Sequence, residues 1–280
     1  MAGKALNIGG KLMDLSVPRV MGIMNVTDDS FYAKSRFASK DSILFRARQI
    51  MEEGGSFVDI GGCSTRPGAE LVPEEVEAER VAFAVECVRR EFPELPVSVD
   101  TFRAKVAEVA VRECGASVVN DVSGGELDDE MIGTVARLGV PYVLMHCGKN
   151  PDNMHKLNSY DDFLRDIFLY FSEKLQNLHL QGVKDVLIDP GFGFGKTMEQ
   201  NYELLGALSL FESLDCPVLA GFSRKRMVWQ LLGSSPDEAL NGTTALNVLA
   251  LVNGADILRV HDVRAAAEAV KIVEMYRMCK

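Results

Sequence analysis

Eight short apolar segments of this chain each run into a polar or charged residue. In chain order these residues are Asn25, Asp59, Asp100, Asn120, His146, Asp189, Ser223 with Lys225, and Arg259 with His261. Helix capping or a loop turn explains a single Asp, Asn or Ser at such a place. Capping does not explain why Lys225, Arg259 and His261 occur among the carboxylates. The whole set therefore predicts a functional site made from strand ends.

These side chains offer two kinds of binding chemistry. Carboxylates and amides accept hydrogen bonds from ring N–H and amino groups, and Lys225 donates to a carbonyl. That combination suits a neutral, flat, nitrogen-rich ring. Arg259, His261 and the loop residue Arg66 instead suit an anion. The sequence therefore predicts a site for a heterocycle with an anionic group beside it.

Two glycine-rich segments lie among these residues. Residues 191–196 end like a phosphate-binding P-loop, but Pro190 stands where that motif requires glycine. The glycines let backbone approach a ligand or permit a tight turn, and both readings remain open. Residues 61–68 carry Arg66 between flexible glycines and suit a mobile lid. Phe31 and Phe194 either stack on an aromatic substrate or anchor their loops.

The apolar segments alternate with segments of helical periodicity, as in βα units around a parallel sheet. The expected strands are residues 20–24, 57–60, 97–99, 117–119, 142–145, 186–188, 218–220 and 257–260. The expected helices are residues 39–53, 74–91, 103–114, 128–138, 160–181, 199–212, 224–232, 236–253 and 263–278. Eight strands predict a single (β/α)8 TIM barrel, which typically has ~250 residues and its active site at the carboxyl ends of the strands.

The barrel is expected over residues 19–280, with residues 1–18 as an N-terminal segment that covers its bottom. An open doubly wound sheet is the structural alternative, because periodicity alone does not show whether the sheet closes.

Composition narrows the class of partner. The net charge of −10 works against nucleic acid or an anionic membrane and favours small-molecule substrates. The six cysteines form no CxxC pair, which fits a reducing, cytoplasmic location. The chain also lacks an HExxH motif and any long apolar stretch, so we expect neither a zinc hydrolase nor a membrane anchor.

Taken together, the motifs of the chain resemble those of dihydropteroate synthase. The matching segments are Met21-Gly22-Ile23-Met24-Asn25-Val26-Thr27, Asp59-Ile60-Gly61-Gly62, Ser64-Thr65-Arg66-Pro67-Gly68, Ser98-Val99-Asp100-Thr101, Asn120-Asp121, Leu144-Met145-His146, Asp189-Pro190-Gly191-Phe192-Gly193-Phe194-Gly195-Lys196, Ser223-Arg224-Lys225, Asn241-Gly242-Thr243 and Arg259-Val260-His261-Asp262. The resemblance covers residues 19–280. The chain departs from the usual residues of the family at Asp28, Cys63 and Cys147, all in or next to loops.

The resemblance implies a role for each part of the site. The pterin would contact Asp100, Asn120, Val122, Met145, Asp189, Gly221 and Lys225. The p-aminobenzoate would contact Phe31, Thr65, Arg66, Pro67, Phe194 and Ser223. The diphosphate would contact Asn25, Thr65, Arg259 and His261, with Asn25 also on Mg2+. The catalytic residues would be Arg66, Asp100, Lys225, Arg259 and His261. The resemblance leaves only structural roles for Asp59 and His146.

The activity implied is the joining of 6-hydroxymethyl-7,8-dihydropterin diphosphate to p-aminobenzoate. In this family the C–O bond breaks first and diphosphate leaves before the aniline attacks. A homodimer through the last helices is also implied, and the apolar stripe along residues 263–275 is compatible with it. Two alternatives are a pterin-dependent methyltransferase and a pterin-binding paralogue without activity. Arg259 disfavours the methyltransferase and Asn25 the paralogue, and Arg66 and His261 disfavour both, because neither has a diphosphate to hold.

Overall fold

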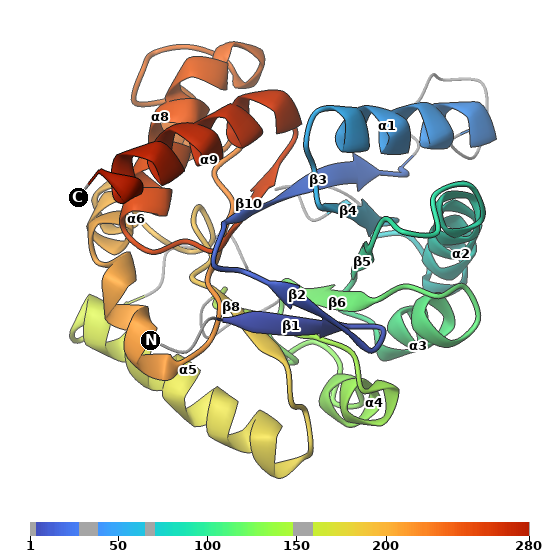
Figure 1. The fold of residues 1–280 in the computed structure, drawn as a ribbon. Helices are drawn as coiled ribbons and strands as arrows, with labels where there is room; N and C mark the ends of the chain where they lie inside the picture. Colours follow the sequence, from blue (N-terminus) through green and yellow to red (C-terminus); the bar gives the residue numbers. More distant parts are fainter. Residues whose placement is uncertain (1–3, 28–38, 65–70, 148–158, 280) are drawn as a thin grey trace.

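The computed structural model describes residues 4–27, 39–64, 71–147 and 159–279. Eight parallel strands form a central barrel, and helices surround it (Figure 1). The barrel strands are β3 (Arg19–Asn25), β4 (Phe57–Gly61), β5 (Val97–Asp100), β6 (Val118–Asp121), β7 (Tyr142–Met145), β8 (Val186–Asp189), β9 (Leu219–Ala220) and β10 (Ile257–Val260). Each expected strand is present, within about two residues of its expected bounds.

The sheet closes on itself. Its hydrogen-bonded order is β8-β7-β6-β5-β4-β3-β10-β9. Between the two end strands, Ile188 and Val218 form a parallel bridge, and the Ile188 amide donates to the Pro217 carbonyl at 2.9 Å. The predicted (β/α)8 barrel is therefore confirmed, and the open sheet is excluded.

The surrounding helices pack against buried apolar side chains of the strands. They are α1 (Lys40–Glu52), α2 (Glu74–Glu91), α3 (Ala104–Arg112), α4 (Met131–Leu138), α5 (Phe163–Leu180), α6 (Met198–Gly206), α7 (Arg226–Trp229), α8 (Leu240–Val252) and α9 (Val263–Met278). Capping residues explain where two of these helices begin or end. Thr197 forms a capping box with Gln200 at the start of α6, and Gly139 ends α4 in the left-handed conformation.

Three of the expected helices are wrong in extent. The helix expected at residues 199–212 ends at Gly206 and continues as the 3-10 helix η2 (Leu208–Leu214), because glycine weakens a helix interior. The expected segment 224–232 shrinks to α7, since Arg224 has a left-handed φ of 58° and Lys225 is extended. The segment 236–253 is divided into η3 (Pro236–Glu238) and α8.

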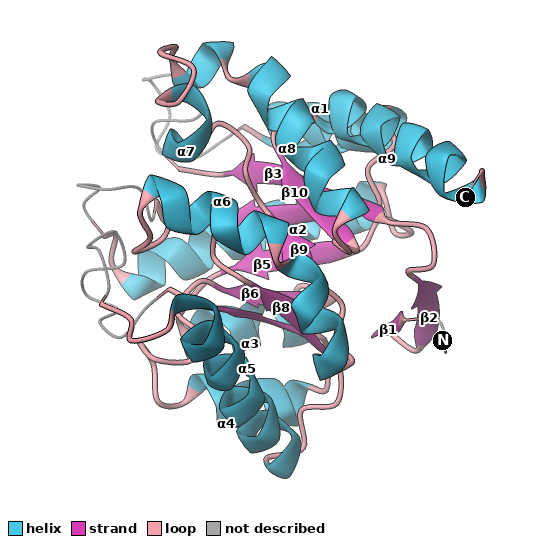
Figure 2. Ribbon diagram, turned by 90° about the vertical axis from the view of Figure 1, so that its left-hand side faces the viewer, coloured by secondary structure: helices cyan, strands magenta, loops and turns pink. Residues whose placement is uncertain are grey.

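A hairpin lies across the amino-terminal end of the barrel (Figure 2). Its strands are β1 (Ala5–Ile8) and β2 (Lys11–Asp14), joined by Gly9 and Gly10, both with positive φ. Two-residue hairpin turns favour that conformation. Leu6 and Leu15 are buried against Met21, Phe57, Val118, Val143, Leu187, Leu219 and Ile257. The hairpin thus covers the apolar interior at this end, while the polar strand ends lie at the other.

Among the described residues, no helix is both long enough and apolar enough to cross a membrane.

Candidate active site

One arginine links two carboxylates at the mouth of the barrel. Arg259 extends from β10, and its Nε donates to Asp59 Oδ2 at 2.6 Å while its Nη2 donates to Asp100 Oδ2 at 2.6 Å. Asp59 lies on β4 and Asp100 ends β5, so the guanidinium spans the mouth past the intervening strand β3. Asp59 is fully buried, and Arg259 and Asp100 are about one-fifth exposed.

Burial and the neighbouring charges shift the pKa values of Asp100 and Arg259. Burial raises the pKa of Asp100 to about 7, Arg259 opposes this shift, and the nearby Asp59 carboxylate adds to it. Burial alone would lower the pKa of Arg259, but Asp59 and Asp100 outweigh it and raise that pKa above its ordinary value. One cation therefore serves two carboxylates, and Asp100 is poised to gain or lose a proton near neutral pH.

Strand register places further polar groups beside this pair. Asn25 pairs with Gly61, Gly61 with Asp100, and Asp100 with Asn120 along four neighbouring strands. Gly61 lies between Asn25 and Asp100 without a side chain, and an added Cβ there would lie 3.6 Å from both Asn25 Oδ1 and Asp100 Oδ2. The buried Asn120 donates from Nδ2 to Asp59 Oδ2 at 3.0 Å.

The opposite side of the mouth holds a lysine and a carboxylate. Asp189 ends β8 and accepts from the Gly191 amide at 2.8 Å. Lys225 donates from Nζ to the Phe192 carbonyl at 2.7 Å, and its ammonium lies 4.8 Å from the centre of the Phe194 ring. Burial lowers the pKa of Lys225 to about 8, although Asp189 counteracts that shift. Burial likewise raises the pKa of Asp189, against the effect of Lys225.

An apolar wall completes this side. Val122, Met145, Phe102 and Cys147 form a small buried cluster, and Phe194 packs against it. The cluster is separate from the main core and lies next to the polar strand ends. Gly221 follows β9, and a Cβ there would lie 3.9 Å from Lys225 Nζ. A flat ring therefore has apolar neighbours for its face and polar groups for its edge.

His261 and Ser223 form the side of the site where an anion is expected to bind. The His261 amide donates to Ser223 Oγ at 3.1 Å, and Ser223 Oγ lies 3.0 Å from His261 Nδ1. Burial lowers the pKa of His261 to about 4, and Arg259 and Arg224 lower it further. The imidazole is therefore neutral at pH 7. Ser223 Oγ therefore accepts from the backbone of His261 and forms a second hydrogen bond with the Nδ1 of its ring.

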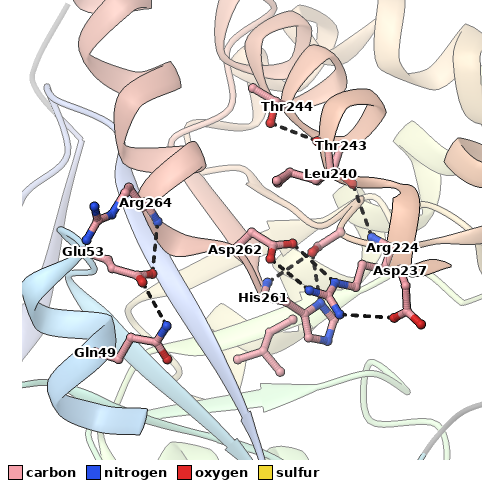
Figure 3. A network of polar contacts seen from close by, with 12 residues as sticks. Gln49, Glu53, Arg224, Asp237, Leu240, Thr243, Thr244, His261, Asp262 and Arg264 are labelled. Carbon is pink, nitrogen blue, oxygen red and sulfur yellow. Dashed lines mark hydrogen bonds and ion pairs between the residues drawn. The ribbon is translucent and has the colours of Figure 1, made fainter. Parts of the chain in front are cut away.

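Neighbouring arginines hold this side in place. Arg224 forms an ion pair with Asp262 at 2.9 Å and a longer one with Asp237 at 3.7 Å (Figure 3). Arg46, on α1, donates to the Ile23 carbonyl at 3.2 Å and to the His261 carbonyl at 2.6 Å. It therefore ties the end of β10 to β3. Asn25, Arg46, Arg224 and His261 also line a common cavity.

Some expected site residues fall outside the described part of the chain. These are Phe31, Thr65, Arg66 and Pro67. The remaining expected residues all lie at or just beyond the carboxyl ends of the barrel strands: Asn25, Asp100, Asn120, Val122, Met145, Asp189, Phe194, Gly221, Ser223, Lys225, Arg259 and His261. Their gathering on one face is the arrangement that the strand-end pattern predicts.

Comparison with known proteins defines the class. The model of the pterin binding enzyme family matches residues 21–261. Dihydropteroate synthase of Escherichia coli (strain K12) is 39% identical over 267 residues, which cover 95% of this chain and 94% of that protein. The Xanthomonas albilineans dihydropteroate synthase structure with 4-aminobenzoic acid has a TM-score of 0.88 at 37% identity, covering 99% of both chains. The same enzyme in complex with 7,8-dihydropteroate has a TM-score of 0.85 at 36% identity, covering 98% of this chain and 99% of that one.

The chain belongs to the pterin binding enzyme family. Within that family its place is among the dihydropteroate synthases, the transferases that form dihydropteroate in folate biosynthesis. The resemblance read from the sequence is thereby confirmed. The relatives do not support the methyltransferase or the inactive paralogue.

Two residues matter more to the site than their sequence context indicates, and a third carries no signal in the sequence. Asp59 holds both Arg259 and Asn120, so its structural role lies inside the site rather than behind it. Its place in the Asp-Ile-Gly-Gly segment was the available signal. His146 contacts the buried Lys196. Arg46 lies on a helix, and nothing in its neighbouring residues indicates that it reaches two strand ends.

We predict that Asp59→Asn lowers the pKa of Asp100. The change removes a negative charge that raises this pKa, and Arg259 then pairs with Asp100 alone. The pKa is measured by a 13C NMR titration of aspartate carboxyl carbons, with the signal assigned through Asp100→Asn. The midpoint near 7 should move to lower pH. Asp129→Asn removes a charge at an exposed position and serves as the control; equal midpoints in the wild type and Asp59→Asn would contradict the prediction.

Proposed function

We propose that this site catalyses dihydropteroate synthesis by binding the pterin between Asp100 and Lys225 and the diphosphate beside Arg259 and His261. The observation that carries the proposal is the bridge from Arg259 to Asp59 and Asp100. It places one fixed cation between Asp100, which is proposed to bind the ring, and the side of the site proposed to bind the diphosphate. Departure of diphosphate requires positive charge at that boundary, since charge builds on the leaving oxygen.

The pterin would lie on the apolar wall of Val122 and Met145. Asp100, Asn120 and Asp189 would accept hydrogen bonds from ring N–H and amino groups, and Lys225 would donate to the ring carbonyl. Gly221 leaves room next to Lys225 Nζ. Because Asp100 has a raised pKa of about 7, its ionised form becomes dominant as the pH rises through that value. Pterin binding should therefore strengthen over the same range.

The leaving diphosphate would meet Arg259, Asn25 and the imidazole of His261. A neutral imidazole donates a hydrogen bond without requiring prior protonation, and a bound anion would raise the pKa of His261 from about 4. Asp100 would offset positive charge that spreads into the pterin as the C–O bond breaks. Thr65 and Arg66 are expected to add contacts to the same group.

Magnesium suits this end of the site. Mg2+ takes oxygen ligands and often keeps only one or two from protein, with phosphate and water as the rest. Asn25 offers such an oxygen beside Gly61, whereas the described residues contain no cluster of three His, Cys, Asp or Glu that could hold a metal ion without substrate. Mg2+ would neutralise charge on the diphosphate. The ion is therefore expected to bind together with the pterin diphosphate.

The p-aminobenzoate would lie between Phe194 and Ser223, with Phe31, Thr65, Arg66 and Pro67 closing its pocket. Phe194 packs against the apolar wall and its ring faces Lys225, which places it next to the proposed pterin position. The aniline amine is neutral at physiological pH and attacks the pterin methylene directly. A general base is hardly needed, which agrees with a site whose only described imidazoles are buried and neutral.

A cytoplasmic location and a homodimer complete the proposal. All six cysteines are free, as a reducing compartment allows. On α9, Val263, Ala266, Val270 and Val273 are buried. The other face of the same helix leaves Ile272 and Met275 more than 60% exposed, and Leu249 and Val252 of the adjoining α8 are also exposed. This second apolar surface supports pairing with another copy of the chain.

The reaction itself is tested by turnover of purified protein. Diphosphate release should require the pterin diphosphate and Mg2+, and should be fast only when p-aminobenzoate is also present. Dihydropteroate should form in equal amount. A methyltransferase or a non-catalytic pterin-binding protein would release no diphosphate, so absence of turnover would sink the assignment.

Lys225→Ala and Arg259→Ala should separate binding from departure of diphosphate. Lys225→Ala removes a charged hydrogen bond to the pterin and should weaken pterin affinity by roughly 10- to 100-fold. Arg259→Ala removes charge stabilisation in the transition state and should lower kcat by on the order of 100-fold or more. Calorimetry with a pterin ligand and steady-state kinetics measure the two effects. Identical changes in affinity and kcat for both variants would contradict the separate roles.

Replacing Ile272 with Glu should convert the dimer into a monomer. The charge would lie in the exposed apolar surface of α8 and α9, where pairing would bury it without a partner. Analytical ultracentrifugation measures the mass. Leu180→Glu, at an exposed apolar residue of α5, is the matched control and should keep the wild-type mass. A monomeric wild type, or an Ile272→Glu variant that remains dimeric, would overturn the proposed interface.

A further inference from the structure

The loop after β8 winds around a buried ammonium group. Lys196 is 7% exposed. Its Nζ lies 2.9 Å from the Gly191 carbonyl oxygen, 3.1 Å from that of Phe194 and 3.3 Å from that of His146. The fourth neighbour is His146 Nδ1, at 3.1 Å. All four are potential acceptors, so the loop and the end of β7 converge on this lysine.

The His146 ring acts as an acceptor in this contact. Burial and the Lys196 charge lower the pKa of His146 to about 2, so the imidazole is neutral. Burial lowers the pKa of Lys196 to about 7. In its protonated form Lys196 only donates, so Nδ1 then carries the lone pair and Nε2 the proton. Tyr170 packs edge-on against the ring, with the two ring centres 4.9 Å apart. His146 is thus an oriented neutral partner rather than a second charge.

Glycine allows the loop to approach so closely. Gly191 has a φ of 71°, and a Cβ at this position would lie 1.9 Å from the His146 carbonyl oxygen. Gly193 has a φ of 81°, its amide donates to Asn201 Oδ1 at 2.6 Å, and a Cβ there would meet Lys225 Cδ at 3.2 Å. The loop is therefore docked on three sides: β7, α6 and the Lys225 side chain.

The groups that this loop presents are the ones that contact Lys225. The Phe192 carbonyl accepts from Lys225 Nζ, and the Phe194 ring faces the same ammonium. Lys196 binds the carbonyl of Phe194 itself and that of Gly191, which precedes Phe192. Movement of Lys196 would therefore displace both contacts of Lys225. Lys196 is therefore linked to Lys225 and to the Phe194 ring through Phe194 itself and through Gly191 and Phe192.

We propose that Lys196, paired with neutral His146, is a positioning residue that holds residues 190–195 so that Phe194 and Lys225 are preorganised for p-aminobenzoate and pterin. The inference rests on the proposed roles of Phe194 and Lys225. Lys196 contacts neither substrate. Its contribution is to fix the loop before the substrates arrive, which reduces the ordering cost of binding.

Removal of the ammonium should weaken substrate binding more than it slows the chemical step. In Lys196→Met, the KM for p-aminobenzoate and the dissociation constant of the pterin ligand should each rise about 10- to 100-fold, as for loss of hydrogen bonds to a charged group. The kcat at saturating substrate should change by less than about threefold, because bound substrate restores the loop. Lys174→Met is the matched control: Lys174 also donates to a loop carbonyl, that of Gly124, but has no contact with this loop.

The pairing with His146 is tested by a double-mutant cycle. His146→Leu removes the acceptor and should raise the same constants as Lys196→Met does, whereas His146→Asn keeps an acceptor near the Nδ1 position and should restore near-wild-type values. The double variant Lys196→Met with His146→Leu should be no worse than the poorer single variant. Effects that multiply in the double variant would show two independent contributions and overturn the pairing.

Hydrogen exchange separates failure of this inference from failure of the proposed function. The amides of Gly193 and Phe194 donate to Asn201 Oδ1 and to the Gly191 carbonyl. Their exchange should accelerate at least tenfold in Lys196→Met and His146→Leu, but not in Lys174→Met or His146→Asn. Thermal denaturation establishes that each variant is folded. Unchanged exchange and unchanged KM in folded Lys196→Met would overturn the inference even if the enzyme is fully active.

Discussion

The bridge from Arg259 to Asp59 and Asp100 determines how the rest of the site is arranged. Burying a charge is costly unless it is paired, and truncation of one member of a buried pair typically costs ~3–5 kcal/mol. Here a single guanidinium pairs with two carboxylates from strands that are not its neighbours. Asn120 adds a hydrogen bond to the same Asp59 oxygen. The bridge joins β10 to β4 and β5 at the mouth of the barrel. Burial raises the pKa of Asp100 to about 7, and Arg259 opposes that shift.

A second constraint acts across the mouth, where backbone rather than charge sets the geometry. The glycine-rich loop brings carbonyl groups to two lysines, the buried Lys196 and the half-buried Lys225. Positive φ at Gly191 and Gly193 makes that approach possible. Of the two interpretations left open for these glycines, approach to a ligand and a tight turn, the structure shows the turn, in which the Phe194 amide donates to the Gly191 carbonyl at 3.1 Å. The backbone approaches side chains of the protein itself.

Much of the fold and part of the site were predictable. The strand positions were predictable, because buried parallel strands are short apolar runs with glycine or polar residues at their ends. The extents of the helices near Gly206 and Arg224 were not, because each depends on a local backbone conformation that periodicity does not report. Polar strand ends identified the candidate site residues, but not which of them pair. The contacts of Arg46 were not predictable, because they depend on two strand ends far from it in the chain.

By itself the sequence determined the alternation of strands and helices, the polar character of one end of the barrel and the resemblance to dihydropteroate synthase. These follow from residue types at short spacings along the chain. Only the tertiary structure decided that the sheet closes between β8 and β9, and that Arg259 joins Asp59, 200 residues away, to Asp100, 159 residues away. The physical reason is that barrel closure brings distant strands to a common mouth. There, competition among buried charges for few partners selects the pairs, and no local pattern records that choice.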